Sequence, residues 1–169
     1  MFLLYLDAST WSKRYTGERG CNVLDAILDE AAITGNGDLF SSAVSHAETL
    51  SALVRFRNRT PLPAAQFGYD LSRLSADRDK LSWLTVADDA FRRCTDLILK
   101  HNLNATDAAL LEVLADLQHQ VQPEGHELWL IAADKRFLRA AAAEGLACLD
   151  PEVSSPREVR ELFARWINR

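Results

Sequence analysis

The chain has 169 residues and a hydrophobic content of 48%, which is enough to bury the core of one ordinary domain, so we expect a single domain over residues 1–169. Its 19 basic and 24 acidic residues give a formal net charge of −5, so general electrostatic attraction to nucleic acid or to anionic lipid is not implied. A substrate that carries phosphate would therefore need local help, such as metal ions.

Two kinds of segment alternate along the chain: short apolar runs that suit buried strands, and longer stretches with apolar residues at helical spacing. "FLLYLD" is of the first kind, and "CNVLDAILDEAAI", which the glycines of "TGNGD" follow, is of the second. In chain order we expect a strand over 2–7, a helix over 21–33, a strand over 39–43, helices over 44–56 and 63–81, a strand over 82–87, helices over 88–101 and 107–120, a strand over 127–133, a helix over 134–145, a strand over 146–149 and a helix over 155–167.

Strands that are separated by helices indicate βαβ units, and hence an α/β fold whose parallel sheet is covered by helices on both faces. Functional sites in such sheets lie just beyond the carboxyl ends of the strands. Asp7 ends the first apolar run, and Asp134 directly follows the run "ELWLIAA". The sequence therefore places two carboxylates at the edge where a site is expected.

Four acidic residues each have an ordinary structural explanation when they are taken alone. Asp7 and Asp134 stand where a helix N-cap accepts a backbone N–H, and Asp107 stands in a first helical turn, where the helix dipole favours a carboxylate. Glu48 lies beside small and apolar residues of its helix, so we expect it to be half-buried. A buried carboxylate needs a cation, a hydrogen-bond donor or a metal, although small neighbours can also simply leave a surface notch.

Together, the four acids would converge on one end of the sheet. Clustered carboxylates repel one another, whereas Mg²⁺ or Mn²⁺ accepts oxygen ligands and compensates their charge. Bound Mg²⁺ keeps several waters and commonly bridges carboxylates to phosphate oxygens, which indicates phosphodiester or phosphoryl chemistry by a metal-activated water. We therefore predict a metal site formed by Asp7, Glu48, Asp107 and Asp134.

The stretches "YLDAS", "SSAVSHAETLSAL", "NATDAALLEVL" and "LIAADKRFLRAA" resemble the four acidic motifs of PIN-domain ribonucleases, especially the VapC-type toxins of toxin–antitoxin pairs. The resemblance spans almost the whole chain. It implies a PIN-like three-layer fold with a five-stranded parallel sheet between helices, metal-dependent cleavage of RNA, a homodimer and a small antitoxin protein as partner. In that family the matching residues are the metal-binding acids, so the resemblance implies this role for Asp7, Glu48, Asp107 and Asp134.

The surroundings of the acids partly follow the family pattern. Ser9 matches a small hydroxyl position after the first acid, where it would orient a ligand or water, or serve only as a local cap. Two residues before the last acid the family usually has Thr or Ser, whereas this chain has Ala132, and a missing hydroxyl would weaken the support of the metal site. The segment 61–81 is longer than a minimal PIN domain needs, so partner binding or substrate choice can differ there.

Six basic residues adjoin these motifs in the sequence. We consider them as contacts to RNA phosphates, with an ordinary solvated surface position as the alternative. They are Lys13, Arg14, Arg55, Arg57, Lys135 and Arg136.

Two other functions compete with the ribonuclease hypothesis. Haloacid-dehalogenase-like phosphohydrolases also begin with an aspartate after a first strand, but they need a second acid two residues later, where this chain has Ser9. A PIN-like fold that has lost catalysis and only binds a partner is the second alternative, and Ala132 fits it.

The remaining sequence signals concern the compartment. Three widely spaced cysteines give neither a disulfide framework nor a zinc motif, and the four histidines supply no second metal site. No run approaches the roughly 18 apolar residues of a membrane helix, and the N-terminal apolar run is too short for a signal peptide. We therefore expect a cytoplasmic protein that does not enter membranes.

Overall fold

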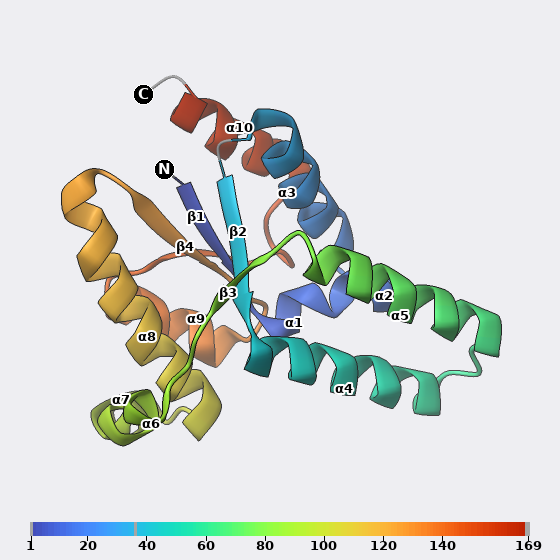
Figure 1. Cartoon of the computed structure of the whole chain (residues 1–169), viewed down its shortest axis with the longest axis horizontal. Coiled ribbons are helices and arrows are strands. Elements are labelled where there is room, and N and C mark those ends of the chain that lie inside the picture. Colours follow the sequence, from blue (N-terminus) through green and yellow to red (C-terminus); the bar gives the residue numbers. More distant parts are fainter. Residues whose placement is uncertain (1, 36, 168–169) are drawn as a thin grey trace.

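The computed structural model describes residues 2–35 and 37–167, and its centre is a parallel β-sheet (Figure 1). The strand order is β3-β2-β1-β4-β5, with every neighbouring pair parallel, which confirms the predicted five-stranded parallel sheet. The strands are β1 (Phe2–Leu6), β2 (Gly37–Ser42), β3 (Ser82–Leu84), β4 (Glu127–Ile131) and β5 (Ala147–Leu149).

The helices lie where the helical spacing predicts them, with shifts of a few residues at their ends. The short helix that the N-cap position of Asp7 predicts is present as α1 (Ala8–Trp11), and a second four-residue helix, α2 (Lys13–Thr16), follows it. The helix expected over 88–101 is divided at Cys94, whose ψ of 3° interrupts the helical backbone. The helices are α1 (Ala8–Trp11), α2 (Lys13–Thr16), α3 (Cys21–Thr34), α4 (Ala43–Arg59), α5 (Ala64–Arg78), α6 (Asp88–Arg93), α7 (Thr95–His101), α8 (Ala105–Val121), α9 (Lys135–Ala143) and α10 (Pro156–Ile167), and a 3₁₀ turn, η1 (Gln122–Glu124), follows α8.

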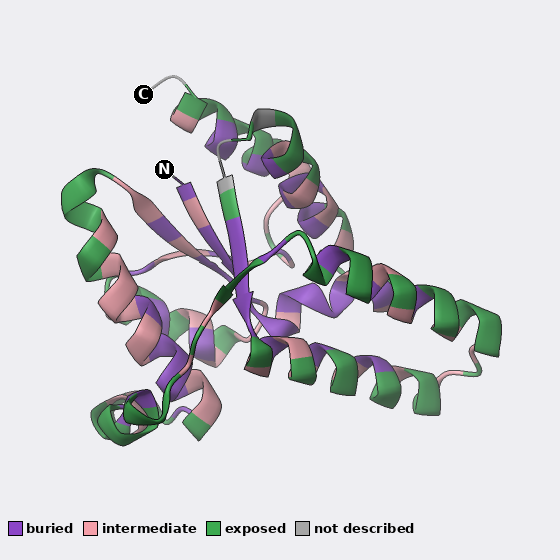
Figure 2. Ribbon diagram, in the orientation of Figure 1, coloured by how far each residue is buried: buried purple, intermediate pink, exposed green. Residues whose placement is uncertain are grey.

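Each face of the sheet has its own apolar core, because successive strand side chains point to opposite faces. Leu4 of β1 packs into the core formed with α3 and α10, whereas its neighbour Tyr5 packs into the core formed with α8 and α9. The strand interiors are buried, and the outer surfaces of the helices are exposed (Figure 2). Helices on both faces of a five-stranded sheet make the three layers expected of a PIN-like α/β fold.

The order of the strands determines where a site can form. The chain passes from β1 outward to β2 and β3, and then returns to place β4 on the other side of β1. Such a reversal leaves a crevice beyond the carboxyl ends of the two central strands. Pairing continues one residue past β1, where the Asp7 N–H donates to the carbonyl of Ile131 at 3.0 Å, so the ends of β1 and β4 are held side by side.

The helices also show two features of the molecule as a whole. Helices α4 and α5 extend beyond the sheet on the same side of the molecule (Figure 1). Within residues 2–35 and 37–167, no helix combines the length and the apolar character that crossing a membrane requires.

Candidate active site

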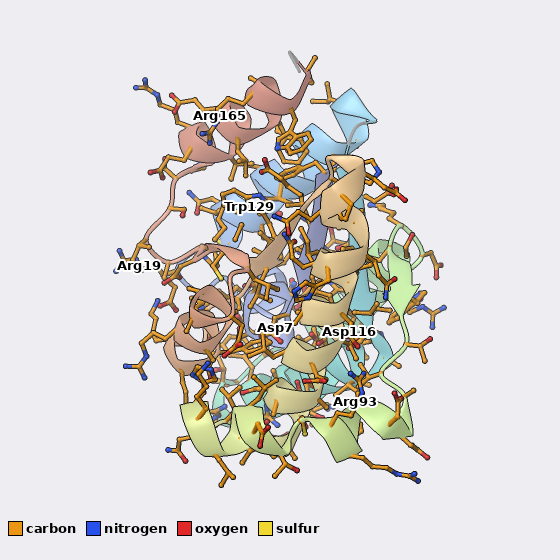
Figure 3. All side chains as sticks on the ribbon, turned by 90° about the vertical axis from the view of Figure 1, so that its left-hand side faces the viewer. Asp7, Arg19, Arg93, Asp116, Trp129 and Arg165 are labelled. Atoms are coloured by element: carbon orange, nitrogen blue, oxygen red, sulfur yellow. The ribbon has the colours of Figure 1, made fainter. Side chains whose placement is uncertain are left out.

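The four predicted acids line one cleft of about 380 Å³ beyond the carboxyl ends of the strands. They come from four separate elements: the end of β1, helix α4, the first turn of α8 and the start of α9. Figure 3 shows Asp7 deep inside the molecule, beneath the surrounding helices. The cleft also contains the hydroxyl residues Ser9, Ser12 and Ser51.

Asp7 is the most buried of the four acids, with 5% of its surface exposed. It is the N-cap of α1, and its Oδ2 accepts hydrogen bonds from the Ser9 N–H at 2.9 Å and the Ser9 hydroxyl at 2.5 Å. Burial raises the pKa of Asp7, the bonds from Ser9 and the N–H of Ala8 counteract that rise, and the charge of Asp134 adds to it. A buried, partly compensated carboxylate of this kind is suited to bind a cation.

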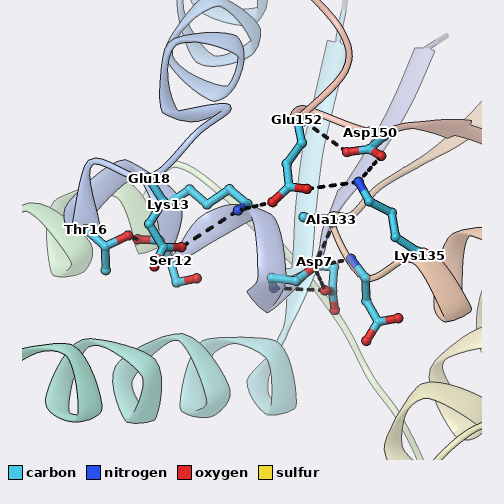
Figure 4. A network of polar contacts seen from close by, with 11 residues as sticks. Asp7, Ser12, Lys13, Thr16, Glu18, Ala133, Lys135, Asp150 and Glu152 are labelled. Atoms are coloured by element: carbon cyan, nitrogen blue, oxygen red, sulfur yellow. Dashed lines mark hydrogen bonds and ion pairs between the residues drawn. The ribbon is translucent and has the colours of Figure 1, made fainter. Parts of the chain in front are cut away.

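Ser9 links the two central strand ends. Besides donating to Asp7, its Oγ accepts from the N–H of Ala133 at 2.9 Å and, at 3.3 Å, from that of Asp134. Figure 4 shows Asp7, Ala133 and the neighbouring polar groups at this junction. The Ser9 hydroxyl therefore completes a local cap at Asp7 and also reaches the loop that carries Asp134.

Asp134 is a helix cap whose second oxygen is still available. Its Oδ1 accepts from the N–H groups of Arg136 at 2.8 Å and Phe137 at 3.0 Å, which caps α9. Among the residues that the structure describes, no donor forms a hydrogen bond with its Oδ2, and the residue lines the cleft. Capping and metal binding can thus use different oxygens of one carboxylate.

Asp107 is hydrogen-bonded to Asn104 and interacts electrostatically with the other three acids. It forms a reciprocal pair with Asn104, whose Oδ1 accepts from the Asp107 N–H at 2.8 Å and whose Nδ2 donates to Asp107 Oδ2 at 2.9 Å. Burial and then the charges of Asp7, Asp134 and Glu48 raise the pKa of Asp107 to about 7, while Arg136 opposes the rise. The repulsion expected from clustered acids is therefore present at this residue.

Glu48 is half-buried, as predicted from its small neighbours. Helix α4 begins at Ser42, whose Oγ accepts from the Ser45 N–H at 3.1 Å, and this start directs Glu48 to the cleft one and a half turns later. Burial and the charge of Asp7 raise the pKa of Glu48, and Arg55 lowers it.

The donor set fits a hard divalent cation. Asp7, Glu48, Asp107 and Asp134 offer carboxylate oxygens, the ligands that Mg²⁺ and Mn²⁺ prefer, and no cysteine, methionine or histidine is among the described residues that line the cleft. In the described part of the chain, no three acid, histidine or cysteine side chains already stand in ligand geometry around one point. The acids thus converge on a shared cleft whose charge an ion would compensate, without closing around one position.

Ala132 lies where the family usually has a hydroxyl, and its side chain is 0% exposed. It packs in the apolar core on the α8 and α9 face of the sheet. Buried hydroxyls occur instead at the neighbouring strand end, where the hydroxyl of Tyr5 is 2.9 Å from Ser42 Oγ and 2.8 Å from Ser45 Oγ. Local sequence patterns do not predict the hydrogen bonds of Tyr5 with Ser42 and Ser45, because Tyr5 fits the pattern of an ordinary buried strand residue.

Two of the six basic candidates, Lys13 and Lys135, are engaged in ion pairs. Lys13, 6% exposed, contacts Glu152 at 2.7 Å and Glu18 at 3.7 Å. Lys135 pairs with Asp150 and, at 3.0 Å, with the same Glu152 (Figure 4). The structure therefore places both lysines in a network beside the cleft and not in its lining.

The four arginine candidates also differ in their surroundings. Arg14 pairs with half-exposed Asp25 of α3 and buried Asp77 of α5, and Arg57 lies with its guanidinium 4.6 Å from the ring centre of Phe67. Arg136 is partly buried near Asp107. Only Arg55, among these six basic candidates, lines the acid cleft in the described structure.

Comparisons with known proteins identify the family and the fold. The family model described as PIN domain matches residues 4–143. The crystal structure of PAE2754 from Pyrobaculum aerophilum has a similar fold, with a TM-score of 0.58 and 15% sequence identity over 100% of both chains. A sequence comparison with curated proteins gives no significant match. A haloacid-dehalogenase-like phosphohydrolase is accordingly not favoured, and the chain belongs to the PIN-domain family, whose members are generally nucleases.

Proposed function

We propose that this protein is a Mg²⁺- or Mn²⁺-dependent endoribonuclease that cleaves RNA phosphodiesters with a metal-activated water. The observation that carries the proposal is the convergence of Asp7, Glu48, Asp107 and Asp134 on one cleft, where their mutual repulsion contributes to a pKa of about 7 at Asp107. Membership of the PIN-domain family supports the same reaction class. A module that only binds a partner has no need to keep four mutually repelling acids in one cleft.

In this mechanism the side chains of the protein position the metal ions and the RNA. Asp7, Glu48, Asp107 and Asp134 would hold one or two ions, and Ser9 fixes Asp7 against the start of α9. When bound, a divalent ion lowers the pKa of water and stabilises charge on phosphate oxygens. No side chain in this account attacks the RNA, so the four acids act as ligands and the walls of the cleft align the strand.

The biological setting follows from the resemblance to VapC-type toxins. We propose that the protein acts in the cytoplasm as a toxin, forms a homodimer and is inhibited by a small antitoxin protein. These three properties rest on the resemblance of the motif set, and each has a direct measurement: growth arrest on expression, solution mass and co-purification with a neighbouring gene product.

The activity is tested by cleavage of a mixture of RNAs by the purified protein in Mg²⁺ or Mn²⁺ and in chelator. We expect metal-dependent cleavage that Asp7→Asn lowers by at least about 100-fold, because loss of a direct ligand should cost no less than loss of a supporting partner. The matched control is Asp29→Asn, which neutralises an exposed acid of α3 outside the acid cleft. Cleavage by Asp7→Asn at the wild-type rate would show that the activity does not arise in this cleft.

A further inference from the structure

The acid cleft continues into a second cavity along helix α4. This cavity, of about 260 Å³, shares Ser12, Ala52 and Arg55 with the acid cleft, so the two form one continuous depression. We call this second cavity the arginine groove. Besides the shared residues, its lining includes Thr16 and Arg59. A strand that crosses the four acids therefore has a lined path onward between α4 and the α1–α2 segment.

Arg55 and Arg59 are spaced to follow a nucleic acid backbone along this path. They are four residues apart on α4, and so lie on one face of the helix about 6 Å apart along its axis. The Arg59 Nε donates to the Arg55 carbonyl at 3.2 Å, which holds the Arg59 side chain back along the helix toward Arg55 and the acid cleft.

Arg55 and Arg59 differ from many basic residues of this chain in their surroundings. Within residues 2–35 and 37–167, neither Arg55 nor Arg59 has an acidic partner within ion-pair distance, whereas Arg93, for example, contacts three acids. Arg55 does lower the pKa of Glu48 through its charge. Glu18 also lines the groove, where it lies 3.7 Å from Lys13, which it shares with Glu152.

The remaining lining suits the other parts of a nucleotide. Ser12 and Thr16 bring hydroxyl groups from the α1–α2 side, which faces α4 in Figure 4. Phe56 adds part of an aromatic ring to the wall. Hydroxyl groups and arginines contact phosphate and sugar, and an aromatic surface accepts a base by stacking.

We propose that the arginine groove binds the phosphate next to the one that is cleaved. This inference rests on the proposed ribonuclease function. The chain has a net charge of −5 and an acidic cleft, so a polyanion needs local cations beside the scissile phosphate. A strand that follows the groove passes Phe56, against which a base can stack.

The first test measures binding without catalysis, by fluorescence anisotropy of a labelled single-stranded RNA in chelator. Arg59→Gln should weaken binding by about five- to tenfold and reduce the slope of log Kd against log salt by about 0.7, the value for one lost phosphate contact on a single strand. The control, Arg165→Gln, makes the same charge change on α10, which Figure 3 shows at the far end of the molecule from Asp7. Equal affinities and salt slopes for the two variants would overturn the groove assignment.

The second test separates the groove from the ribonuclease function itself. Two short RNAs each carry one uncharged methylphosphonate, at the linkage before or after the cleaved one. We expect one of these two RNAs to be cleaved more slowly than unmodified RNA by the wild-type protein, but not by Arg59→Gln. If the protein cleaves RNA and neither linkage discriminates the two proteins, the groove assignment fails alone. If no RNA is cleaved but binding still depends on Arg59, the groove is supported and the ribonuclease function fails.

Discussion

The Ser9 hydroxyl accepts a hydrogen bond from the N–H of Ala133 at 2.9 Å, across 124 positions of sequence. The same Oγ donates to Asp7 Oδ2 at 2.5 Å, within the short range of bonds to an ionised acceptor. One side chain thus connects the acid at the end of β1 to the turn that precedes α9. This link adds to the backbone hydrogen bond from Asp7 to Ile131, which also joins the two strand ends.

We predict that Ser9→Ala loosens the junction and weakens metal binding. The change removes one donor to Asp7 and leaves the Ala133 N–H without its side-chain acceptor, which should lower the free energy of unfolding by about 1–3 kcal/mol and Mn²⁺ affinity by about 10- to 100-fold. Calorimetric Mn²⁺ titration and thermal melts measure the two effects. Ser51→Ala is the control, because Ser51 lines the same cleft but is exposed. Equal Mn²⁺ affinities in the two variants would show that Ser9 has no positioning role.

Asp134→Ser should separate the two uses of this carboxylate. Serine keeps an oxygen that can cap α9, so the free energy of unfolding in chelator should change by less than about 0.5 kcal/mol, whereas Asp134→Ala should lose about 1 kcal/mol. The serine side chain cannot replace the second carboxylate oxygen, and RNA cleavage should fall sharply. A Ser variant that cleaves RNA at the wild-type rate would identify Asp134 as a cap alone.

Neutralising Asp107 should stabilise the metal-free protein, increasingly so as the pH rises. The pKa of Asp107 is raised to about 7 in the folded protein, so its protonated form favours folding below its ordinary value near 3.8, and this advantage is lost as the pH rises through 7. Asp107→Asn should therefore match the wild type near pH 4 and exceed it by about 1 kcal/mol at pH 8, after allowance for solvent screening and for a lost helix-dipole benefit of about 0.3–1 kcal/mol.

Urea denaturation in chelator at both pH values measures this difference. The control is Asp29→Asn, which removes an exposed acid of α3 outside the acid cleft and should show no comparable gain. A variant that is less stable than the wild type at pH 8 would mean that the acids do not repel one another appreciably.

Glu152→Gln should release the network that holds α2 beside the start of α9. Hydrogen bonds from Lys13 and Lys135 lower the pKa of Glu152 to about 2. A depressed carboxylate pKa stabilises the fold above the ordinary value of 4.5, and the stabilisation is lost as the pH falls toward 2. We expect Glu152→Gln to lower the free energy of unfolding by about 1 kcal/mol at pH 7, because buried Lys13 then has Glu18 as its remaining ion-pair partner among the described residues. The decrease should be smaller at pH 3.

Equilibrium denaturation at pH 7 and pH 3 measures this effect. Glu161→Gln is the comparison, since its ion pair with Arg157 at 2.7 Å lies between two exposed side chains of α10 and should contribute less. Glu152→Gln and Glu161→Gln of equal stability at pH 7 would show that the Glu152 network adds nothing beyond an ordinary surface pair.

The order of strands and helices could be predicted because it is written in local patterns. The apolar run that ends at Asp7 forms β1, and the helical spacing over 107–120 forms most of α8. The parallel sheet follows from the alternation of these patterns, and the carboxyl ends of its strands bring Asp7 and Asp134 to one edge. Glu48 and Asp107 could be added because their helices start beside that edge.

What local patterns could not supply are contacts that depend on distant chain segments. Lys13 and Lys135 read as free basic residues, but each meets Glu152, which is 139 residues from Lys13. The link from Ser9 to Ala133 and the continuation of the acid cleft to Arg59 likewise appear only when the elements pack. The division at Cys94 was missed because both halves keep their helical apolar spacing.

The central claim is that the four carboxylates bind divalent ions at one shared site, and titration of Mn²⁺ followed by electron paramagnetic resonance measures this directly. Wild-type protein should remove Mn²⁺ from the free-ion signal with saturation at one or two ions, and Asp7→Asn, Glu48→Gln, Asp107→Asn and Asp134→Asn should each weaken this binding, with the largest loss for buried Asp7. Mn²⁺ binding that is unchanged in all four variants, or absent from the folded wild-type protein, would contradict the account.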